Sequence, residues 1–299
     1  MPTIPVQRET LMHVVKTMPA APQILSRLSQ IRLDPNVDLE DVTALLRLDA
    51  ALTARIMRVA NSAVYCQGEA YSSIEQALAR IGFGEVYMIA GFAAIAQMAN
   101  QNLRLYGVSG SAIRENSLLT ALTAEALAEL AGADTHEAYS AGLLRSVGKI
   151  ALDGMVYAAG LLRSKSIALW GQTHKAALST SYDPKTCGML ADWETEVVGI
   201  RNCEAAAFIL NEWRFPAAIA SAIGGHYVPE EVSSGSLAAN LLNLAAGAAE
   251  RRGFGLPGEE PYWDLRPERL AAAGVSEEQL ESASERAIEK FKALHSAVS

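Results

Sequence analysis

The sequence is poor in strand-forming residues and in cysteine. Aromatic residues make up 6% of the 299 positions, and the three cysteines form no C-x-x-C pair. Alanine and leucine are abundant, whereas Val, Ile, Phe, Tyr and Trp are comparatively few, which favours helices over strands. We therefore predict an all-α fold with two lobes. An odd number of separated cysteines is typical of a reduced, cytoplasmic protein rather than of a disulfide scaffold.

A long hydrophobic run, an export signal and an excess of positive charge are also missing. The longest apolar run, Val86 to Ala96, is too short to span a bilayer. The first residues show no basic segment followed by an apolar one. The net charge of −8 argues against a DNA or RNA binder, which must neutralise phosphates. We expect a cytoplasmic protein with no membrane insertion and no nucleic-acid partner.

Glycine and apolar periodicity divide the chain into helices and connections. A helix capped by Ser73 should end at Gly82, and the very apolar run Val86 to Ala99 should form a helix that is buried on most sides. We expect Phe92 and Ile95 of this helix to be buried, at the spine of one lobe or between two lobes. The polar interval Asn100 to Ser111, with two glycines, is the best candidate for a linker.

This linker gives a division into three parts. Residues 1–108 would form an N-terminal helical lobe, residues 109–253 a second helical lobe, and residues 254–299 a C-terminal loop and charged helix. The letters of residues 253–258 match G-x-G-x-x-G, but they follow a helix and lead into Glu259 and Glu260, which would repel a pyrophosphate. We interpret them as a plain loop.

The most informative stretch runs from Tyr139 to Leu152. Its Leu143, Leu144 and Val147 fall on one face of a helix that Gly148 should end. The stretch also resembles the A-G-L-L-H-D-I-G-K motif of the HD phosphohydrolase superfamily, in which the His-Asp pair binds metal. Here Arg145 and Ser146 stand in place of that pair, and a guanidinium cannot ligate a cation.

The resemblance extends over residues 18–229 and is to the HDOD domain family, relatives of the HD and HD-GYP phosphohydrolases in bacterial signalling proteins. Five runs carry it: M-P-A-A-P-Q-I-L at Met18, L-D-A-A-L-T-A-R-I-M-R-V-A-N-S-A at Leu48, S-I-E-Q-A-L-A-R-I-G at Ser73, W-R-F-P at Trp213 and I-G-G-H-Y-V-P at Ile223. Their order and spacing make chance agreement improbable.

The resemblance implies where the superfamily's metal ligands would fall. The corresponding positions hold Asn116, Arg145, Ser146, Asn202, His226, Tyr227 and Ala246. Of these only His226 is an ordinary ligand, and a catalytic metal needs at least three protein ligands. We therefore expect no catalytic residues, no metal and no cofactor. We expect His226 itself to be a hydrogen-bonded histidine near a helix end, and the alternative is a metal ligand.

The function implied is that of a non-enzymatic regulatory protein of bacterial signal transduction. It would act through contacts with another signalling protein, whose identity the sequence does not give. One alternative is a sensor of a nucleotide or cyclic dinucleotide, and another is a metal-dependent phosphohydrolase. Asp49, Arg55, Asn61 and Ser62 match the family's signature run. We expect them to serve within the fold, in capping, ion pairing and helix-end hydrogen bonds, and the alternative is a surface for a partner protein.

Arg145 is suited to replace the lost metal, because it would place a permanent charge and five donors in the old site. We predict that it points inward and pairs with a carboxylate, either Glu115 or Glu204. Lys149 would lie one turn away on the same face. Together Arg145 and Lys149 would form an anion-binding spot; the alternative is that Arg145 points into solvent.

Overall fold

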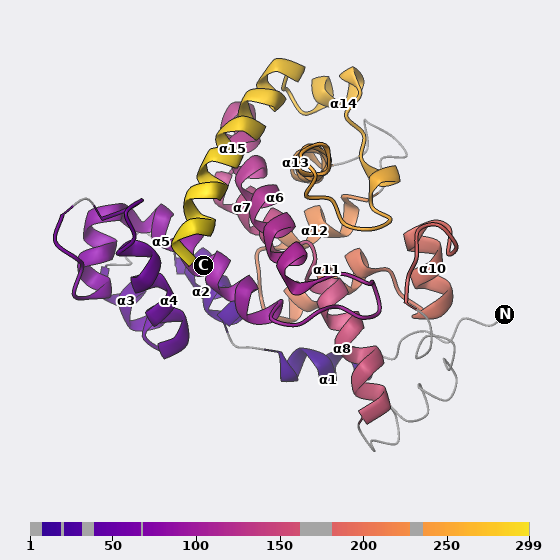
Figure 1. Cartoon of the computed structure of the whole chain (residues 1–299), viewed down its shortest axis with the longest axis horizontal. Helices are drawn as coiled ribbons and strands as arrows, with labels where there is room; N and C mark the ends of the chain where they lie inside the picture. Colours follow the sequence, from indigo (N-terminus) through magenta and orange to yellow (C-terminus); the bar gives the residue numbers. More distant parts are fainter. Residues whose placement is uncertain are drawn as a thin grey trace.

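The computed structural model describes residues 8–18, 21–31, 39–66, 68–161, 181–227 and 236–298. In these ranges the structure is helical, and the only extended pairing is one antiparallel bridge between Leu103 and Val108. The predicted all-α class is confirmed. The helices are α1 Arg8–Thr17, α2 Ala21–Ile31, α3 Leu39–Leu46, α4 Ala50–Ala60, α5 Ile74–Met98, α6 Gly110–Ala131, α7 Thr135–Leu144, α8 Val147–Leu161, α10 Leu190–Val197, α11 Asn202–Glu212, α12 Ala217–Gly225, α13 Leu237–Arg251, the 3-10 helix η1 Glu260–Tyr262, α14 Pro267–Ala272 and α15 Glu277–Val298 (Figure 1).

The apolar helix α5 is a core helix. Ser73 caps its start, and Gly82, with a φ of 85°, interrupts it without ending it. Phe92 and Ile95 are 6% and 0% exposed, as predicted. By length and composition α5 could cross a membrane, but most of it is buried against other helices, as in a soluble domain.

The interval Asn100 to Ser111 is packed and does not act as a linker. Leu105 and Tyr106 are buried, and the backbone N–H of Leu105 donates to the Asp153 carboxylate at 2.7 Å. The prediction failed because the polar residues of the interval alternate with buried apolar ones. One core cluster includes side chains on both sides of residue 108, so the division into lobes there stays a prediction.

The helix expected to end at Gly148 breaks earlier. α7 ends at Leu144, the chain turns through Arg145 and Ser146, and Gly148 lies inside α8. A Cβ at Gly148 would lie 1.8 Å from the carbonyl oxygen of Asn202. The glycine therefore lets α8 approach the start of α11 closely and does not end a helix.

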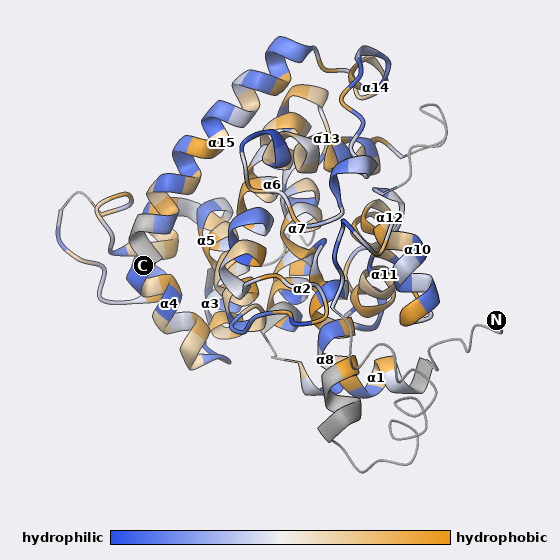
Figure 2. Cartoon of the chain, turned by 45° about the vertical axis from the view of Figure 1, so that its right-hand side comes forward, coloured by the Kyte–Doolittle hydropathy of each residue, from blue (hydrophilic) through white to orange (hydrophobic). Residues whose placement is uncertain are grey.

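The C-terminal segment is an integral part of the fold. α15 runs along α6, and its end reaches α4 (Figure 1). Hydrophilic and hydrophobic residues alternate along its length (Figure 2), as expected for a helix with one buried face. The buried side chains recur every three or four residues, at Leu280, Ala283, Ala287, Phe291 and Leu294.

Candidate functional site: a buried ion cluster

Three charged side chains meet in the interior of the protein. Arg145 Nη2 lies 2.7 Å from Glu259 Oε2, and Lys149 Nζ lies 2.6 Å from Glu259 Oε1. All three side chains are 1% exposed. Tyr227 also donates its hydroxyl to Glu259 Oε1. One carboxylate thus receives two cations and a phenol in a site closed to water.

Helix geometry positions the two cations. Arg145 lies in the turn between α7 and α8, and Lys149 follows one helical turn later in α8. Both side chains therefore project from the same face and reach the same carboxylate, that of Glu259. Asn116 of α6 accepts a hydrogen bond from Arg145 Nη2 at 2.5 Å, which fixes the guanidinium.

Two glycines shape the loop that carries Glu259. Gly253 and Gly258 have φ angles of 83° and 78°, which side chains rarely adopt. A Cβ on Gly258 would also lie 2.3 Å from the Tyr182 hydroxyl. Asn116 donates to the Phe254 carbonyl at 2.7 Å and so ties the loop to α6. The segment interpreted from sequence as a plain loop supplies the central carboxylate.

Aromatic rings line the cluster. The guanidinium carbon of Arg145 lies 5.3 Å from the Trp263 ring, and Lys149 Nζ lies 5.3 Å from the Tyr106 ring. Tyr227 stacks on Tyr262 with centroids 4.7 Å apart. The ring faces add favourable electrostatics for the cations and exclude water, which strengthens each ion pair.

The charges set the titration of the cluster. Burial opposes ionisation of Glu259, but Arg145 and Lys149 outweigh it and hold the pKa of this carboxyl well below its usual range. Burial raises the pKa of Tyr227 well above 10, and the Glu259 charge adds to that effect. Glu259 is therefore the anion at neutral pH, and Tyr227 is the neutral donor.

A second buried acid lies beside the first. The Glu194 carboxylate accepts hydrogen bonds from the Tyr106 hydroxyl at 2.8 Å and from the backbone N–H of Asn202 at 2.8 Å. The Asn202 amide also donates to it at 3.0 Å. Burial raises the pKa of Glu194, with Lys149 opposing the shift.

His226 is a buried neutral histidine. Its Nδ1 lies 2.6 Å from the Ile223 carbonyl, which assigns the proton to that nitrogen. Burial, reinforced by the charge of Arg145, lowers the pKa of His226 to about 3. Its Nε2 has no hydrogen-bond partner. This agrees with the expected hydrogen-bonded histidine near a helix end.

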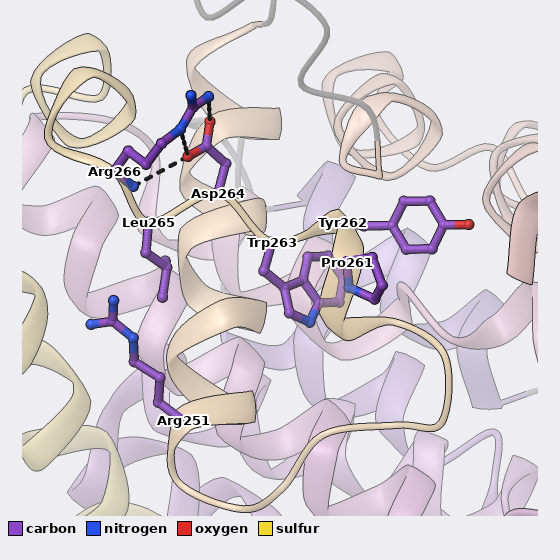
Figure 3. A pocket seen from close by; sticks show the side chains of 7 residues that line it. All are labelled: Arg251, Pro261, Tyr262, Trp263, Asp264, Leu265 and Arg266. Carbon is purple, nitrogen blue, oxygen red and sulfur yellow. Dashed lines mark hydrogen bonds and ion pairs between the residues drawn. The ribbon is translucent and has the colours of Figure 1, made fainter. Parts of the chain in front are cut away.

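Hydrogen bonds and an ion pair hold the segment that follows Glu259 in place. Asn243 of α13 donates to the carbonyls of His226 and Tyr262, both at 2.8 Å, and accepts from the Asp264 N–H at 3.0 Å. Arg266 grips the Asp264 carboxylate with two bonds of 2.8 Å, while Tyr262 extends away from that pair (Figure 3). An open surface cavity of about 510 Å³ lies over this segment.

Four of the residues that fall at the superfamily's metal-ligand positions lie in or beside this cluster. Asn116, Arg145 and Tyr227 contact one another or Glu259, and Asn202 donates weakly to the Tyr227 hydroxyl at 3.4 Å. Ser146 is buried with its hydroxyl unpartnered. Ala246 is buried on α13.

Arg145 does pair with a carboxylate, but the carboxylate is that of Glu259 and not, as predicted, that of Glu115 or Glu204. Glu204 pairs instead with Arg201 at the start of α11, and Glu115 lines a surface cavity. Arg145 and Lys149 do hold an anion, but it is the carboxylate of Glu259 from the same chain. The predicted anion-binding spot is therefore occupied by a side chain of the protein itself.

The described side chains, as arranged, do not fit a catalytic metal. No group of three His, Cys, Asp or Glu side chains able to hold an ion occurs among the residues that the structure describes. Two buried cations at the same place would repel a dication. The remaining oxygen ligands of Glu259 and Glu194 are already engaged by donors.

The residues predicted as a partner surface serve mainly within the fold. Asp49 caps α4 by accepting from the Leu52 N–H at 2.9 Å. The Asn61 side chain forms two hydrogen bonds with the backbone of Tyr71: its Nδ2 donates to the Tyr71 carbonyl, and its Oδ1 accepts from the Tyr71 N–H. Ser62 has a buried hydroxyl. Arg55, which has no partner among the described residues, faces a surface cavity between α4 and α5.

Sequence reasoning did not identify Glu259, Glu194, Tyr106 or Trp263 as members of the site. Glu259 lies outside the region that resembles the HDOD family. The only feature of the sequence that marks it is its position in a loop that contains glycines. The other three come from segments whose sequences look like ordinary helix or loop. Their assembly depends on tertiary contacts over 88 to 114 positions.

The comparisons with known proteins agree with this architecture. The model of the HDOD domain family matches residues 18–229. A structure of an HDOD domain protein from Geobacter sulfurreducens has a TM-score of 0.65 at 20% identity and covers 97% of both chains. A proposed phosphohydrolase from Shewanella amazonensis has a TM-score of 0.64 at 20% identity, covering 97% of this chain and 98% of that one.

A third solved structure is a proposed signal transduction protein from Marinobacter aquaeolei. Its TM-score is 0.67 at 19% identity, and the match covers 97% of this chain and 64% of that one. At such identities the likeness shows the fold. No curated protein matches the chain.

Proposed function

The chain belongs to the HDOD domain family, and from that premise we propose that it is a non-enzymatic regulatory protein of bacterial signal transduction. It would act in the cytoplasm through contacts with another signalling protein. The observation that carries the proposal is the buried cluster of Arg145, Lys149 and Glu259. It fills the place where the related phosphohydrolases would hold their metal.

The cluster supports a scaffold role over a catalytic one. A hydrolase of this superfamily needs a polarising ion and an open position for water or substrate. Here both cations are paired with the one carboxylate, and all three side chains are almost fully buried. A phosphoester would have to displace Glu259 and enter a site without an accessible nucleophile. A metal-dependent phosphohydrolase is therefore the weaker alternative.

Two measurements test the proposal. Protein purified without chelator is assayed for iron, manganese, zinc and cobalt, and then for hydrolysis of bis(p-nitrophenyl) phosphate and of cyclic dinucleotides with each metal added. We expect neither stoichiometric metal nor turnover above that of a chelator-treated sample. Stoichiometric metal together with turnover would overturn the proposal.

The contact role needs a positive result of its own. The tagged chain is cross-linked in its native host, and the captured protein is identified by mass spectrometry and purified. We expect the two purified proteins to form a complex of fixed stoichiometry by light scattering. Failure of every captured protein to re-form such a complex would contradict the proposal.

A further inference from the structure

A groove that contains none of the buried cluster crosses α5 on the molecular surface. A cavity of about 210 Å³ lies between α4 and α5, and a second of about 340 Å³ lies between α5, α6 and α15. Phe92 and Ala96 line both cavities. The two cavities therefore adjoin at these residues, and together we call them the arginine groove.

Positive charge gathers along this groove. Arg55 and Arg58 line its α4 end and are three positions apart, so they project from one face of the helix. Neither makes an ion pair or hydrogen bond with any residue that the structure describes. By contrast, Arg47 on the preceding segment pairs with Glu75 at 2.6 Å.

A third arginine lies farther along the groove. Arg114 of α6 donates from Nη1 to the Ala99 carbonyl at 2.5 Å, which holds its guanidinium at the end of α5. This one bond uses a single donor of the five, so the remaining donors can face the groove. The groove is thus lined by three arginines and by one acidic residue, Glu115.

The floor of the groove is apolar. Phe92, Ala93 and Ala96 are between 5% and 9% exposed, so a thin strip of their surface faces the hollow. Ser111 and Glu115 line the far end and offer a hydroxyl and a carboxylate. A ligand that suits these groups has an anion at one end, a flat or apolar middle, and hydrogen-bond donors at the other end.

The charge at the α4 end selects among anions. Two guanidiniums without counterions match a dianion better than a singly charged carboxylate, and a phosphate monoester carries nearly two negative charges at neutral pH. Arginine forks also bind phosphate oxygens in a bidentate manner. The hollow as a whole has the size of a small-ligand site.

We propose that the arginine groove binds an organic phosphate of the size of a nucleoside monophosphate. The phosphate contacts Arg55 and Arg58, the flat part lies over Phe92 and Ala96, and Glu115 accepts from hydroxyl or amino groups. Binding is non-covalent. This site shares no residue with the buried cluster, and the proposal does not depend on the proposed function.

The test uses the full chain and isothermal titration calorimetry with adenosine, guanosine, cytidine and uridine 5′-monophosphates. Adenosine and inorganic phosphate are the two half-ligand probes. We expect at least one nucleoside monophosphate to bind, with at least tenfold higher affinity than either half-ligand. Its affinity should fall as salt is raised, because the contact is ionic.

Three variants locate the site. Arg55→Gln with Arg58→Gln should weaken binding of that nucleotide at least tenfold, and Ala96→Leu, which fills the floor without a charge change, at least fivefold. Arg80→Gln is the matched control, because Arg80 is an exposed arginine on α5 outside both cavities. It should leave the affinity unchanged. Thermal melts of each variant show whether it folds like the wild type.

The outcomes separate the two proposals. The groove proposal is overturned if no nucleoside monophosphate binds the wild type at millimolar concentration, if inorganic phosphate binds equally well, or if the double arginine variant binds like the wild type. None of these results bears on metal content or on the protein partner. Conversely, metal-dependent turnover would overturn the proposed function and leave nucleotide binding in the groove untouched.

Discussion

Arg145 and Glu259 lie 2.7 Å apart although 114 positions separate them in the chain. The arginine stands where the related phosphohydrolases place a metal-binding histidine, and the glutamate comes from beyond the region that the family model matches. One long-range ion pair therefore joins the loop after α13 to the turn between α7 and α8.

Glu259→Gln should destabilise the protein strongly. The substitution leaves Arg145 and Lys149 buried without a counter-ion, which costs about 3–5 kcal/mol of the free energy of unfolding. Urea unfolding followed by circular dichroism measures the change. The neighbouring Glu260→Gln, on an exposed side chain, is the control and should change stability by less than about 0.5 kcal/mol. Equal effects of the two would show that the pairing contributes nothing.

Two glycines of α8 should respond in opposite ways to alanine. At Gly148 the new Cβ would lie 1.8 Å from the Asn202 carbonyl oxygen, so α8 and α11 must separate. At Gly154, an exposed position, its nearest neighbour would be 4.0 Å away. We expect Gly148→Ala to lower the melting temperature clearly and Gly154→Ala to raise stability by about 0.5–1 kcal/mol. Tolerance of both would mean that the helices do not approach as described.

His226 should make stability fall in mild acid. Its pKa is lowered to about 3 in the folded state by burial and Arg145, against 6.5 for a free histidine. The unfolded chain therefore binds a proton that the folded chain refuses, so this contribution is complete above pH 6.5 and is lost as the pH falls toward 3. At pH 5 the loss is about 2 kcal/mol.

Comparing unfolding at pH 7.5 and pH 5 isolates this effect. The wild type should lose about 2 kcal/mol more than His226→Gln does between the two pH values. His295→Gln, at an exposed histidine, should follow the wild type. Parallel losses in the wild type and His226→Gln would show that His226 takes up its proton equally in both states.

Phe291→Ala tests whether α15 belongs to the core. Its ring is 6% exposed and meets Phe254 edge-on with centroids 5.0 Å apart. The truncation should cost about 3–5 kcal/mol. Lys292→Ala, on the exposed side of the same helix, is the control and should be nearly neutral. A small effect of Phe291→Ala would mean that α15 detaches without loss to the rest of the fold.

The sequence predicted features that depend on local chemistry. The all-α class followed from composition, and the burial of Phe92 and Ile95 followed from apolar periodicity. The inward direction of Arg145 followed from the position of its motif. Each depends on residues within a few turns of one another.

The features that the sequence did not predict depend on distant contacts. Glu259 could not be chosen over Glu115 or Glu204, because the choice is made by a loop that folds back onto α6. Gly148 looked like a helix end, since its close approach to Asn202 is visible only in three dimensions. The interval before Ser111 looked like a linker because polar residues and glycines dominate its sequence. The burial of Leu105 and Tyr106 between them depends on contacts with distant residues.

The late position of Glu259 also bears on the order of events during synthesis. The ribosome makes Arg145 and Lys149 114 and 110 residues before their shared counter-ion. Until that residue emerges, closing the second lobe would trap two unpaired charges in its interior. We expect the helices around Arg145 and Lys149 to remain loosely packed during synthesis. They would pack fully only after the segment with Glu259 has been made, so this late segment would set when the middle of the chain folds.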